Sequence, residues 1–398
     1  MAARVVSPTG RGFLLLDSHP AGCFRSVTDM VAQIPPKAGS QDRKVALVIG
    51  SSAGYGLAAT LAGLVRHGID GVGVAFERPP GRRTGTAGWY RTIATAAVAE
   101  EAGSDFTFLN ADAFADTTKD EVLDLLEKRF GKLDLLVYSV AAPRRTDPRS
   151  GTTYQSVIKP LGAAHTTRTL EFDADGTPAL RDVTATPAGE DEAADTVRVM
   201  GGEDWSRWVT ALADRGLLRE GFRTVALSYI GSSLTSAIYR DGTIGAAKVH
   251  LERTAEELDE RLRPIGGRAL TSVNGAAVTQ ASTAIPGIAL YVSVLHAVLG
   301  DALQSPVEQS VQLWEQLTGA APLDLDEQGR LRLDRWELDP AVQAAVAERW
   351  RAITPETIAE VADVAWFRAQ FRGLYGFDVP GVDYSEPIDP DLDWPAPR

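Results

Sequence analysis

Short apolar runs alternate with longer amphipathic stretches through the first third of the chain. The runs are rich in β-branched and aliphatic side chains, which favour buried strands, at Val45–Ile49, Gly71–Glu77, Asp105–Leu109 and Leu133–Val140. The stretches between them carry apolar residues three or four positions apart and predict helices at Leu57–His67, Ala87–Glu101 and Thr118–Phe130. Strands that alternate with helices form parallel sheets covered on both faces. The pattern therefore predicts an α/β fold on a doubly wound, Rossmann-type parallel sheet.

The same alternation returns in the second half of the chain. Two more apolar runs, Thr224–Ser228 and Arg268–Val273, predict strands of the same sheet. Helices are predicted at Asp204–Leu217, with Asp204 as its N-cap, and at Ile244–Leu262, Pro286–Leu299, Val307–Leu317, Pro340–Ile353 and Thr357–Phe371. We expect the last helices to pack on the sheet. We interpret the tryptophans of this part as packing residues, namely Trp336, Trp350 and Trp366.

Residues 143–203 interrupt the alternation. They are rich in Thr, Asp, Pro and Gly, and short alternating runs at Thr167–Phe172 and Thr196–Met200 predict strands. We interpret this segment as a β-rich excursion beside the substrate site. The arginines at its start are either solvated surface residues or contacts for an acidic part of the substrate, and they are Arg144, Arg145 and Arg149.

The composition agrees with one large, elaborated domain. The chain has 398 residues, of which 44% are hydrophobic, and this is ample for a large core. We interpret it as one dinucleotide-binding domain, 1–398. Its cofactor half, excursion, catalytic half and helical C-terminal part are predicted at 44–142, 143–203, 204–300 and 301–398.

Charge and residue counts exclude several classes of protein. The net charge of −13 argues against nucleic-acid binding, which needs a basic face. The single cysteine, Cys23, excludes an internal disulfide framework, and the five scattered histidines predict no metal site. No apolar run reaches the roughly 20 residues of a membrane span, and Met1–Gly10 does not resemble a signal peptide. We therefore expect a cytoplasmic protein with no membrane insertion.

A glycine-rich turn follows the first predicted strand and leads directly into a helix. Its glycines are Gly50, Gly54 and Gly56, spaced G-x-x-x-G-x-G as in short-chain reductases. Glycines let the backbone approach a pyrophosphate, and the helix N-terminus offers free N–H groups and a positive dipole end. The order strand, glycine turn and helix predicts a dinucleotide site. The alternative is a tight turn without a ligand.

An acidic residue, Glu77, ends the second predicted strand. A carboxylate there accepts hydrogen bonds from the adenosine ribose and repels a 2′-phosphate, so it favours NADH over NADPH. The arginines that follow argue in the other direction, since arginines accept that phosphate, and they are Arg78, Arg82 and Arg83. The loop after the third strand, with Asp112 and Ala113, is placed to touch adenine.

Candidate chemistry lies after the strand Thr224–Ser228. Tyr229 and Tyr239 are predicted on a loop, and the following helix carries Lys248. A phenol can donate a proton to an oxygen that gains negative charge, and a nearby ammonium lowers the phenol pKa and can hold a cofactor hydroxyl. This pair carries little weight without a cofactor site. A small-residue loop after Arg268–Val273 allows close approach of cofactor and substrate.

Several motifs occur in order along nearly the whole chain. They include H-P-x-G-C at His19–Cys23, S-S-A-G-Y-G at Ser51–Gly56, V-Y-S-V-A-A-P-R-R-T-D-P at Val137–Pro148, S-Y-I-G at Ser228–Gly231, V-T-Q-A-S-T-A-I-P at Val278–Pro286 and G-F-D-V-P-G-V-D-Y at Gly376–Tyr384. In this order, and with eight residues between Tyr239 and Lys248, they resemble the FabV-type enoyl reductases. These enzymes act on trans-2-enoyl thioesters of CoA or acyl carrier protein.

The resemblance implies a monomer-prone enzyme that uses NADH to reduce the 2,3 double bond. It implies that Tyr239 stabilises the enolate that forms as hydride reaches the β-carbon, and that Lys248 lies near the nicotinamide ribose and phosphates. Tyr229 is expected on the other side of the substrate, with Tyr55 and Ala142 also in its pocket. The cofactor-binding residues predicted from motifs and resemblance are Gly50, Ser51, Ser52, Gly54, Tyr55, Gly56, Phe76, Glu77, Asp112, Ala113, Ser139, Val140, Ala141, Lys248, Val278, Thr279, Gln280 and Ser282.

Four positions depart from the family pattern and are expected to ring the pocket. Ser232 and Ser233 replace a usual Pro-Glu, Arg240 replaces the Trp after the active tyrosine, and Val249 stands where a second lysine can occur. They leave open the acyl chain length, the choice between CoA and carrier protein, and activity itself. A carbonyl or tailoring reductase of a specialised pathway, and a catalytically silent nucleotide-binding protein, are the alternatives.

Overall fold

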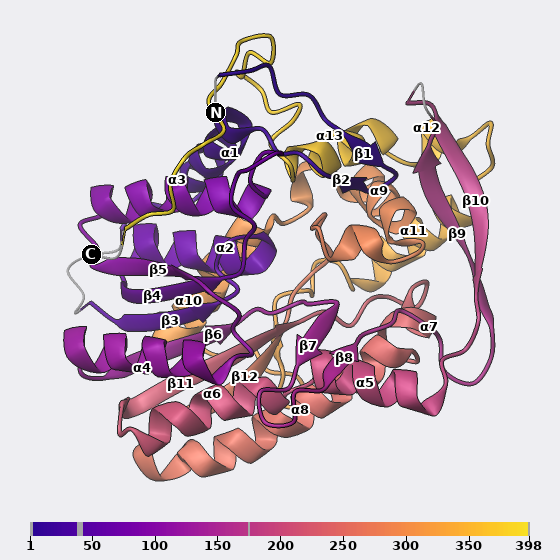
Figure 1. Cartoon of the computed structure of the whole chain (residues 1–398). Helices are drawn as coiled ribbons and strands as arrows, with labels where there is room; N and C mark the ends of the chain where they lie inside the picture. Colours follow the sequence, from indigo (N-terminus) through magenta and orange to yellow (C-terminus); the bar gives the residue numbers. More distant parts are fainter. Residues whose placement is uncertain (1–2, 38–42, 174–175, 397–398) are drawn as a thin grey trace.

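A seven-stranded parallel sheet organises the molecule, for which the computed structural model describes residues 3–37, 43–173 and 176–396 (Figure 1). Both ends of the predicted domain 1–398 and the two internal gaps lie outside the described residues. In spatial order the strands are β13 (Leu331–Arg332), β12 (Arg268–Val273), β11 (Leu218–Ser228), β6 (Leu133–Tyr138), β3 (Val45–Ile49), β4 (Asp70–Ala75) and β5 (Phe106–Asn110).

The predicted α/β fold with a doubly wound parallel sheet is confirmed. All six predicted strands of the sheet are present, and all five residues of β3 are buried because helices cover both faces. The two-residue β13 was missed because it is too short to show a period. The chain runs outward from β3 to β5 and returns at β6, so the strand order reverses between β3 and β6. Ligands of such sheets bind at this reversal, outside the strand C-termini.

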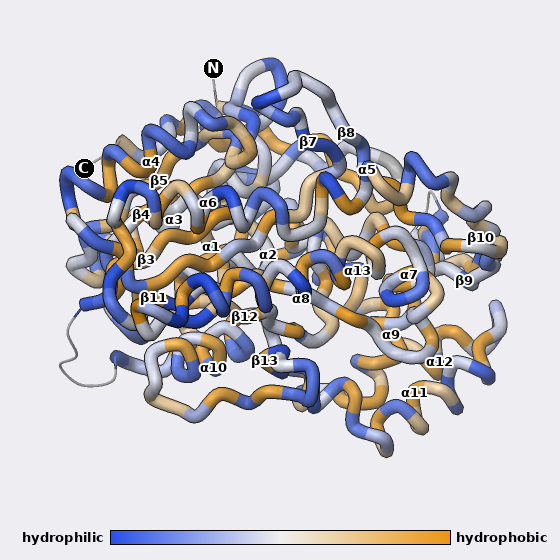
Figure 2. Tube along the Cα trace, turned by 90° about the horizontal axis from the view of Figure 1, so that it is seen from below, coloured by the Kyte–Doolittle hydropathy of each residue, from blue (hydrophilic) through white to orange (hydrophobic). Residues whose placement is uncertain are grey.

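Helices on the two faces form two separate apolar cores with the sheet (Figure 1). One face carries α1 (Pro20–Ala32), α2 (Gly54–Ala62) with its π-helical continuation η1 (Gly63–His67), α3 (Ala87–Glu101) and α10 (Pro306–Thr318). The other carries α4 (Asp116–Arg129), α6 (Glu203–Asp214) and α8 (Thr243–Leu262). Figure 2 shows hydrophobic positions along interior strands such as β3. Trp314 fills the first core and donates its indole N–H to Ala59 O over 2.7 Å.

A third apolar core lies beside the sheet, at the upper right of Figure 1. Its elements are β1 (Gly10–Arg11), β2 (Leu14–Leu15), the hairpin β9 (His165–Phe172) and β10 (Pro178–Ala185), α7 (Ser236–Tyr239), α9 (Ile288–Leu299), α11 (Pro340–Arg351), α12 (Ile358–Val361) and α13 (Val364–Gly373). The expectation that all late helices pack on the sheet was wrong. α10 does pack beside α2, but α11 and α13 pack on α9, because α9 is apolar on all sides and needs partners around it.

Three local predictions were also wrong. Thr196–Met200 is not a strand but the end of helix α5 (Glu190–Met200), whose start is stabilised by the Glu192 carboxylate accepting from Gly189 N over 3.0 Å. Asp204 does not cap α6, since Gly202 does, and its buried carboxylate instead binds Lys119 Nζ at 2.8 Å. The helix predicted at Thr357–Phe371 is broken, because Asp363 caps a new helix by accepting from Trp366 N over 3.0 Å.

The excursion is only partly β-rich. Beside α5 and the β9–β10 hairpin it contains the short pair β7 (Arg144–Thr146) and β8 (Thr153–Gln155). The Arg145 side chain is 1% exposed, donates to Arg198 O over 2.8 Å and pairs with Glu203 at 3.2 Å. Arg145 is therefore neither a solvated residue nor a free substrate contact, whereas Arg144 and Arg149 are exposed.

The described parts of the chain contain no single helix long and apolar enough to cross a membrane. One pair of consecutive helices, Ile288–Ala302 and Pro306–Thr318, has the length and composition of a membrane span when taken together, but the pair is bent by 67°. The remaining short 3-10 turns are η2 (Arg263–Ile265), η3 (Ser282–Ala284) and η4 (Gly300–Ala302).

Candidate active site

The glycine turn after β3 brings two backbone segments into contact at the strand reversal. Gly50 has φ 89°, and a Cβ there would lie 2.1 Å from Ser139 O, directly after β6. A Cβ on Gly56 would lie 1.9 Å from Gly50 O. α2 begins at Gly54 without a side-chain cap, so its first N–H groups face outward for an anion. Only glycine fits this cradle, and the cradle fits a dinucleotide pyrophosphate.

The Glu77 carboxylate is held at the end of β4 beside this turn. The hydroxyl of Ser52 donates to its Oε1 over 2.5 Å, and the hydroxyl of Thr86 donates to its Oε2. Asn110 fixes the Glu77 backbone through bonds of 2.7 and 2.9 Å. Adjacent Phe76 is 74% exposed and presents a flat apolar ring. This arrangement fits an adenosine ribose and its base.

The arginines near Glu77 do not all face a cofactor. The Arg78 guanidinium donates to Thr84 O over 2.8 Å and Leu16 O over 3.3 Å, so it is engaged with the backbone. Asp112 and Ala113 follow β5 at the same edge of the sheet as Glu77. The Asp112 carboxylate accepts from Phe114 N over 3.0 Å, which shapes the loop.

The predicted residues after β6 and β12 meet the glycine turn from the other side. Ser139 N donates to Ile49 O over 2.8 Å. A Cβ on Gly54 would lie 3.6 Å from the Thr279 side chain, so the loop 274–282 faces the turn. Ser282 closes this loop by donating to Ala277 O over 2.8 Å. The Val140, Ala141, Val278 and Gln280 positions belong to these same two segments.

The active-site tyrosine candidate, Tyr239, ends the short helix α7 and is not on an irregular loop as predicted. Gly231, at φ 73°, lets the preceding loop fold back, and a Cβ there would lie 3.1 Å from Tyr239 Cβ. Thr235 supports both ends, since its hydroxyl accepts from Ser232 N over 3.0 Å and its carbonyl accepts from Tyr239 N over 3.1 Å. The Tyr239 ring is 5% exposed.

Electrostatics keep Tyr239 neutral in this state. Burial, and secondarily the charge of Glu337, raise the pKa of the Tyr239 phenol. We expected a nearby ammonium to lower this pKa, and its net direction is the opposite. Burial lowers the pKa of Lys248, on the first turns of α8, to about 8, with Glu252 opposing the shift. The Lys248 ammonium therefore loses its proton more readily than an exposed lysine does, whereas the Tyr239 phenol loses its proton less readily than an exposed tyrosine does.

A buried carboxylate, Glu337, was missed by the sequence analysis. It is 0% exposed, and its Oε1 accepts from the hydroxyls of Tyr229 at 2.8 Å and Tyr291 at 2.7 Å. Its Oε2 accepts from Ala276 N at 2.6 Å. Burial raises the pKa of Glu337 to about 7. No sequence motif marks it, because its partners come from β11, β12 and α9, far away in the chain.

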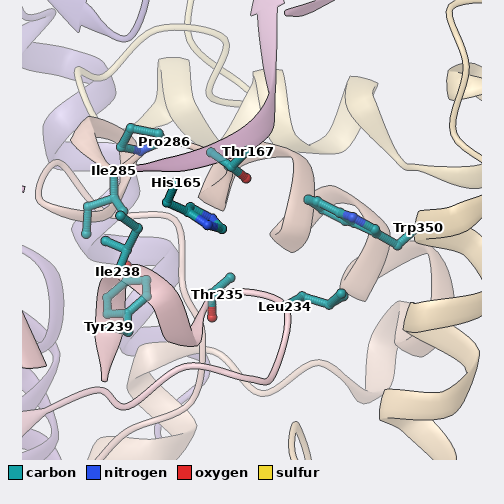
Figure 3. A pocket seen from close by; sticks show the side chains of 10 residues that line it. His165, Thr167, Leu234, Thr235, Ile238, Tyr239, Ile285, Pro286 and Trp350 are labelled. Carbon is teal, nitrogen blue, oxygen red and sulfur yellow. The ribbon is translucent and has the colours of Figure 1, made fainter. Parts of the chain in front are cut away.

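A small pocket, with a free volume of about 10 Å³, opens beside Tyr239 (Figure 3). Its wall includes His165 and Thr167 of β9, Trp350 of α11 and the segment 285–287 that follows the cofactor loop. Figure 3 shows the His165 ring pointing into the space between Thr235 and Thr167, with Trp350 across from it. The sequence analysis missed His165 and treated Trp350 as packing only. The pocket is mostly apolar and lies next to a neutral proton donor.

The predicted substrate residues lie in different surroundings. The Tyr55 hydroxyl donates to Gly275 O, which ties the glycine turn to the loop after β12. Tyr229 is bound to Glu337, and Ala142 O accepts from the Ser156 hydroxyl over 3.2 Å. Neither Tyr55, Tyr229 nor Ala142 belongs to the wall of the pocket in Figure 3.

None of the four departures from the family pattern belongs to the wall of this pocket, so the expectation that they ring it was wrong. Val249 is 55% exposed, because its position on α8 faces outward. Arg240 pairs with Glu252 of α8 at 3.0 Å. Buried Ser232 shapes the loop, since its hydroxyl accepts from Leu234 N over 3.3 Å.

Among the described residues, no group of three or more His, Cys, Asp or Glu could hold a metal ion.

Three family models match consecutive parts of the chain. They are described as the NAD(P)H binding domain of trans-2-enoyl-CoA reductase over residues 5–82, the trans-2-enoyl-CoA reductase catalytic region over 83–318, and the enoyl reductase FAD binding domain over 325–388. The glycine turn and Glu77 fall in the first region. Tyr239 and Lys248 fall in the second, and Glu337 falls in the third.

Known proteins of the same length are similar over the whole chain. A Streptomyces avermitilis protein named as an NADH-dependent enoyl-acyl-carrier-protein reductase is 70% identical over 98% of this chain and 100% of its own. Crystal structures of trans-2-enoyl-CoA reductases from Clostridium acetobutulicum with NADH and from Treponema denticola with NAD each have TM-score 0.90, at 36% and 39% identity. Each comparison covers 97% of this chain and 98% of the other.

The flavin in the third description does not fit the residues present. In this chain the apolar side chains of residues 325–388 are packed on α9 in the third core, and Glu337 is bonded to two tyrosines and Ala276. The nicotinamide cofactor fits the glycine cradle and the Glu77 position.

Proposed function

This chain belongs to the trans-2-enoyl-CoA reductase family, and from that premise we propose its reaction and the residues that perform it. The reaction is the NADH-dependent reduction of the 2,3 double bond of a trans-2-enoyl thioester. The observation that carries the proposal is the position of Tyr239. Its neutral, buried phenol lies in the wall of an apolar pocket, and residues 285–287 of that wall continue the loop that faces the glycine turn.

The glycine turn and Glu77 hold the cofactor. The N–H groups at the start of α2 bind the pyrophosphate, and the carboxylate of Glu77 accepts from the ribose hydroxyls and repels a 2′-phosphate. Bound NADH supplies the hydride. The backbone after β6 and the loop 274–282 would hold the nicotinamide, because both segments meet the glycine turn. These roles are supported by the contacts of Gly50, Gly54 and Glu77.

Tyr239 acts on the substrate carbonyl. Its hydroxyl donates a hydrogen bond to the thioester oxygen, and the bond strengthens as that oxygen gains negative charge on the way to the enolate. Water exclusion by Ile238 and residues 285–287 keeps the site at low dielectric, where such a bond has its greatest effect. Lys248 binds the nicotinamide ribose and the phosphates in its ammonium form. Support comes from its place on the first turns of α8, immediately after α7.

We place the acyl chain at this pocket, which has to widen to admit it because its free volume in this state is about 10 Å³. Its apolar wall suits a hydrocarbon, and its aromatic residues His165 and Trp350 come from elements outside the sheet.

We propose that carrier-linked substrates are used, since the 70% identical relative is named for acyl carrier protein. We also propose a monomeric enzyme acting in the cytoplasm, supported by a site built from one chain and by the use of NADH. The chain works as one domain, because all four predicted parts contribute to the site.

NADH oxidation followed by absorbance tests the proposed function. The assay uses crotonyl-CoA, a longer enoyl-CoA and an enoyl-acyl-carrier protein, beside NADPH and a β-ketoacyl thioester. Rapid loss of NADH with an enoyl thioester is the expected result. Turnover of the keto substrate alone assigns carbonyl reduction instead, and the absence of turnover with every thioester overturns the proposal.

A further inference from the structure

The Glu337 carboxylate joins three elements that carry the site. Tyr229 follows β11, Ala276 follows β12, and Tyr291 lies in α9, and all three donate to this one carboxylate. The loop that carries Glu337 is itself held in place. The backbone carbonyl of Glu337 accepts from Gln343 Nε2 over 2.7 Å. The same Nε2 donates to Tyr291 Oη over 3.2 Å.

Trp336, the residue before Glu337, packs on the loop 274–282 that follows β12. A Cβ on Gly275 would lie 2.3 Å from the Trp336 ring, so the indole packs directly on the glycine backbone. Gly275 N donates to buried Gln309 over 2.8 Å, and Gly275 O accepts from the Tyr55 hydroxyl. Residues 336–337 therefore secure the first part of the loop that goes on to face the glycine turn.

Glu337 also determines where the hydroxyl of Tyr229 points. The Tyr229 ring is perpendicular to the Tyr239 ring, with centroids 4.7 Å apart, so any turn of Tyr229 disturbs the wall behind Tyr239. With the carboxylate as acceptor, the phenol hydrogen of Tyr229 is committed to Oε1. Only its oxygen lone pairs are then left to face the substrate side.

We propose that Glu337 is a positioning residue for the reduction. It holds the Tyr229 ring against the Tyr239 ring, and it fixes Ala276 near the start of the loop 274–282. This inference rests on the proposed function. A carboxamide has the same shape but only one acceptor oxygen, so Glu337→Gln cannot accept from both phenols and from Ala276 N together. At least one of the three hydrogen bonds to residue 337 is lost, and the Tyr229 ring is held less firmly against the Tyr239 ring.

The test is a double-mutant cycle on kcat with crotonyl-CoA and NADH. We expect Glu337→Gln and Tyr229→Phe each to lower kcat by about ten- to a hundredfold, as loss of a hydrogen bond to a charged group does. The double variant is expected to be no slower than the slower single variant, because both changes remove the same relationship. Losses that multiply in the double variant, or a Glu337→Gln enzyme within about twofold of wild type, overturn the proposal.

A matched control separates positioning from stability. Asp204 is a buried carboxylate that also accepts a tyrosine hydroxyl, from Tyr138 at 3.1 Å, but it lies in the opposite core and pairs with Lys119. Asp204→Asn should lower the unfolding temperature and leave kcat within about twofold. A loss of kcat in Asp204→Asn as large as that in Glu337→Gln assigns both to general destabilisation and overturns the proposal.

Two further readouts keep the result decisive. If Glu337→Gln does not fold, Tyr229→Phe decides alone, because wild-type kcat in that variant removes the reason for orienting Tyr229. NADH binding, followed by its fluorescence, shows that each variant retains the cofactor site. Failure of wild-type enzyme on every enoyl thioester rejects the proposed function, whereas normal turnover in Glu337→Gln rejects only the role of Glu337.

Discussion

The ring of Tyr229 stands edge-on to the ring of Tyr239, with centroids 4.7 Å apart and planes at 89°. The two side chains come from the end of β11 and from α7, ten positions apart in the sequence. The edge-to-face contact fixes the orientation of the two rings relative to each other. Because Tyr229 is anchored to Glu337, the position of Tyr239 depends on a residue almost a hundred positions later in the chain.

Removing the Tyr239 hydroxyl should abolish most turnover. We expect Tyr239→Phe to lower kcat by about a hundredfold or more, because the developing charge on the thioester oxygen loses its donor. NADH binding should persist, as measured by fluorescence. The control is Tyr154→Phe, which removes a hydroxyl bonded to Arg198 at 2.9 Å outside the site and should retain activity. Wild-type turnover in Tyr239→Phe contradicts the assigned role.

Lys248 should make cofactor binding sensitive to alkaline pH. Burial lowers its pKa to about 8, so the ammonium is present below that pH and is lost as pH rises through it. The KM for NADH is expected to rise above about pH 8 in wild type. Lys248→Arg keeps its charge throughout and should show a flat profile, although from a higher KM because the shape differs. A rise of equal size in both enzymes argues against Lys248.

Glu77 should determine the choice of nicotinamide cofactor. We expect wild type to prefer NADH over NADPH by about a hundredfold or more in kcat/KM, because a 2′-phosphate would meet the carboxylate. Glu77→Ala should lower that preference by at least about tenfold, mainly through NADPH. Glu101→Ala, at the exposed end of α3, is the matched control and should leave the ratio unchanged. An unchanged ratio in Glu77→Ala would place the discrimination elsewhere.

Trp350 should limit acyl chain length. It lies across the pocket from the side of Tyr239, so Trp350→Ala enlarges the space available to the chain. We expect the ratio of kcat/KM for a long enoyl-CoA over crotonyl-CoA to rise by about tenfold. Trp366→Ala is the control, because Trp366 stacks on His296 at 3.9 Å and does not line the pocket. A similar shift in both variants means that loosened packing, and not pocket size, sets chain length.

Glu337 should make the stability of the fold depend on pH. Burial raises its pKa from 4.5 to about 7, so between these values the folded chain keeps a proton that the unfolded chain has lost. Its contribution to the free energy of unfolding is present below about pH 4.5 and is lost as pH rises through about 7. Relative to Glu337→Gln, wild type should lose about 3 kcal/mol across this interval. Urea unfolding at pH 5 and 7.5 measures it, and a constant difference refutes it.

Local patterns were sufficient for six of the seven strands of the sheet and for the order of elements in the cofactor half. The boundaries of β3, α3 and β12 follow directly from apolar runs and their periods, because each is settled by neighbours in the sequence. Gly50, Gly54 and Gly56 marked the turn, since Gly50 and Gly54 have positive φ and Gly56 packs on the backbone of Gly50, both within the turn itself. The tyrosine and lysine pair was also visible, but only once the cofactor turn and the ordered motifs gave it a context.

What the tertiary structure decided is the surroundings of those residues. Glu337, His165 and Trp350 carry no sequence signal, because each meets residues that are distant in the chain and are brought together by the folding of the third core. The direction of the Tyr239 pKa likewise depends on burial and on Glu337, which a sequence pattern does not contain. The sequence alone therefore determined six strands of the sheet, the glycine turn and the pair of Tyr239 and Lys248. Only the fold determined their dielectric environment and hydrogen-bond partners, since both arise from contacts between distant segments.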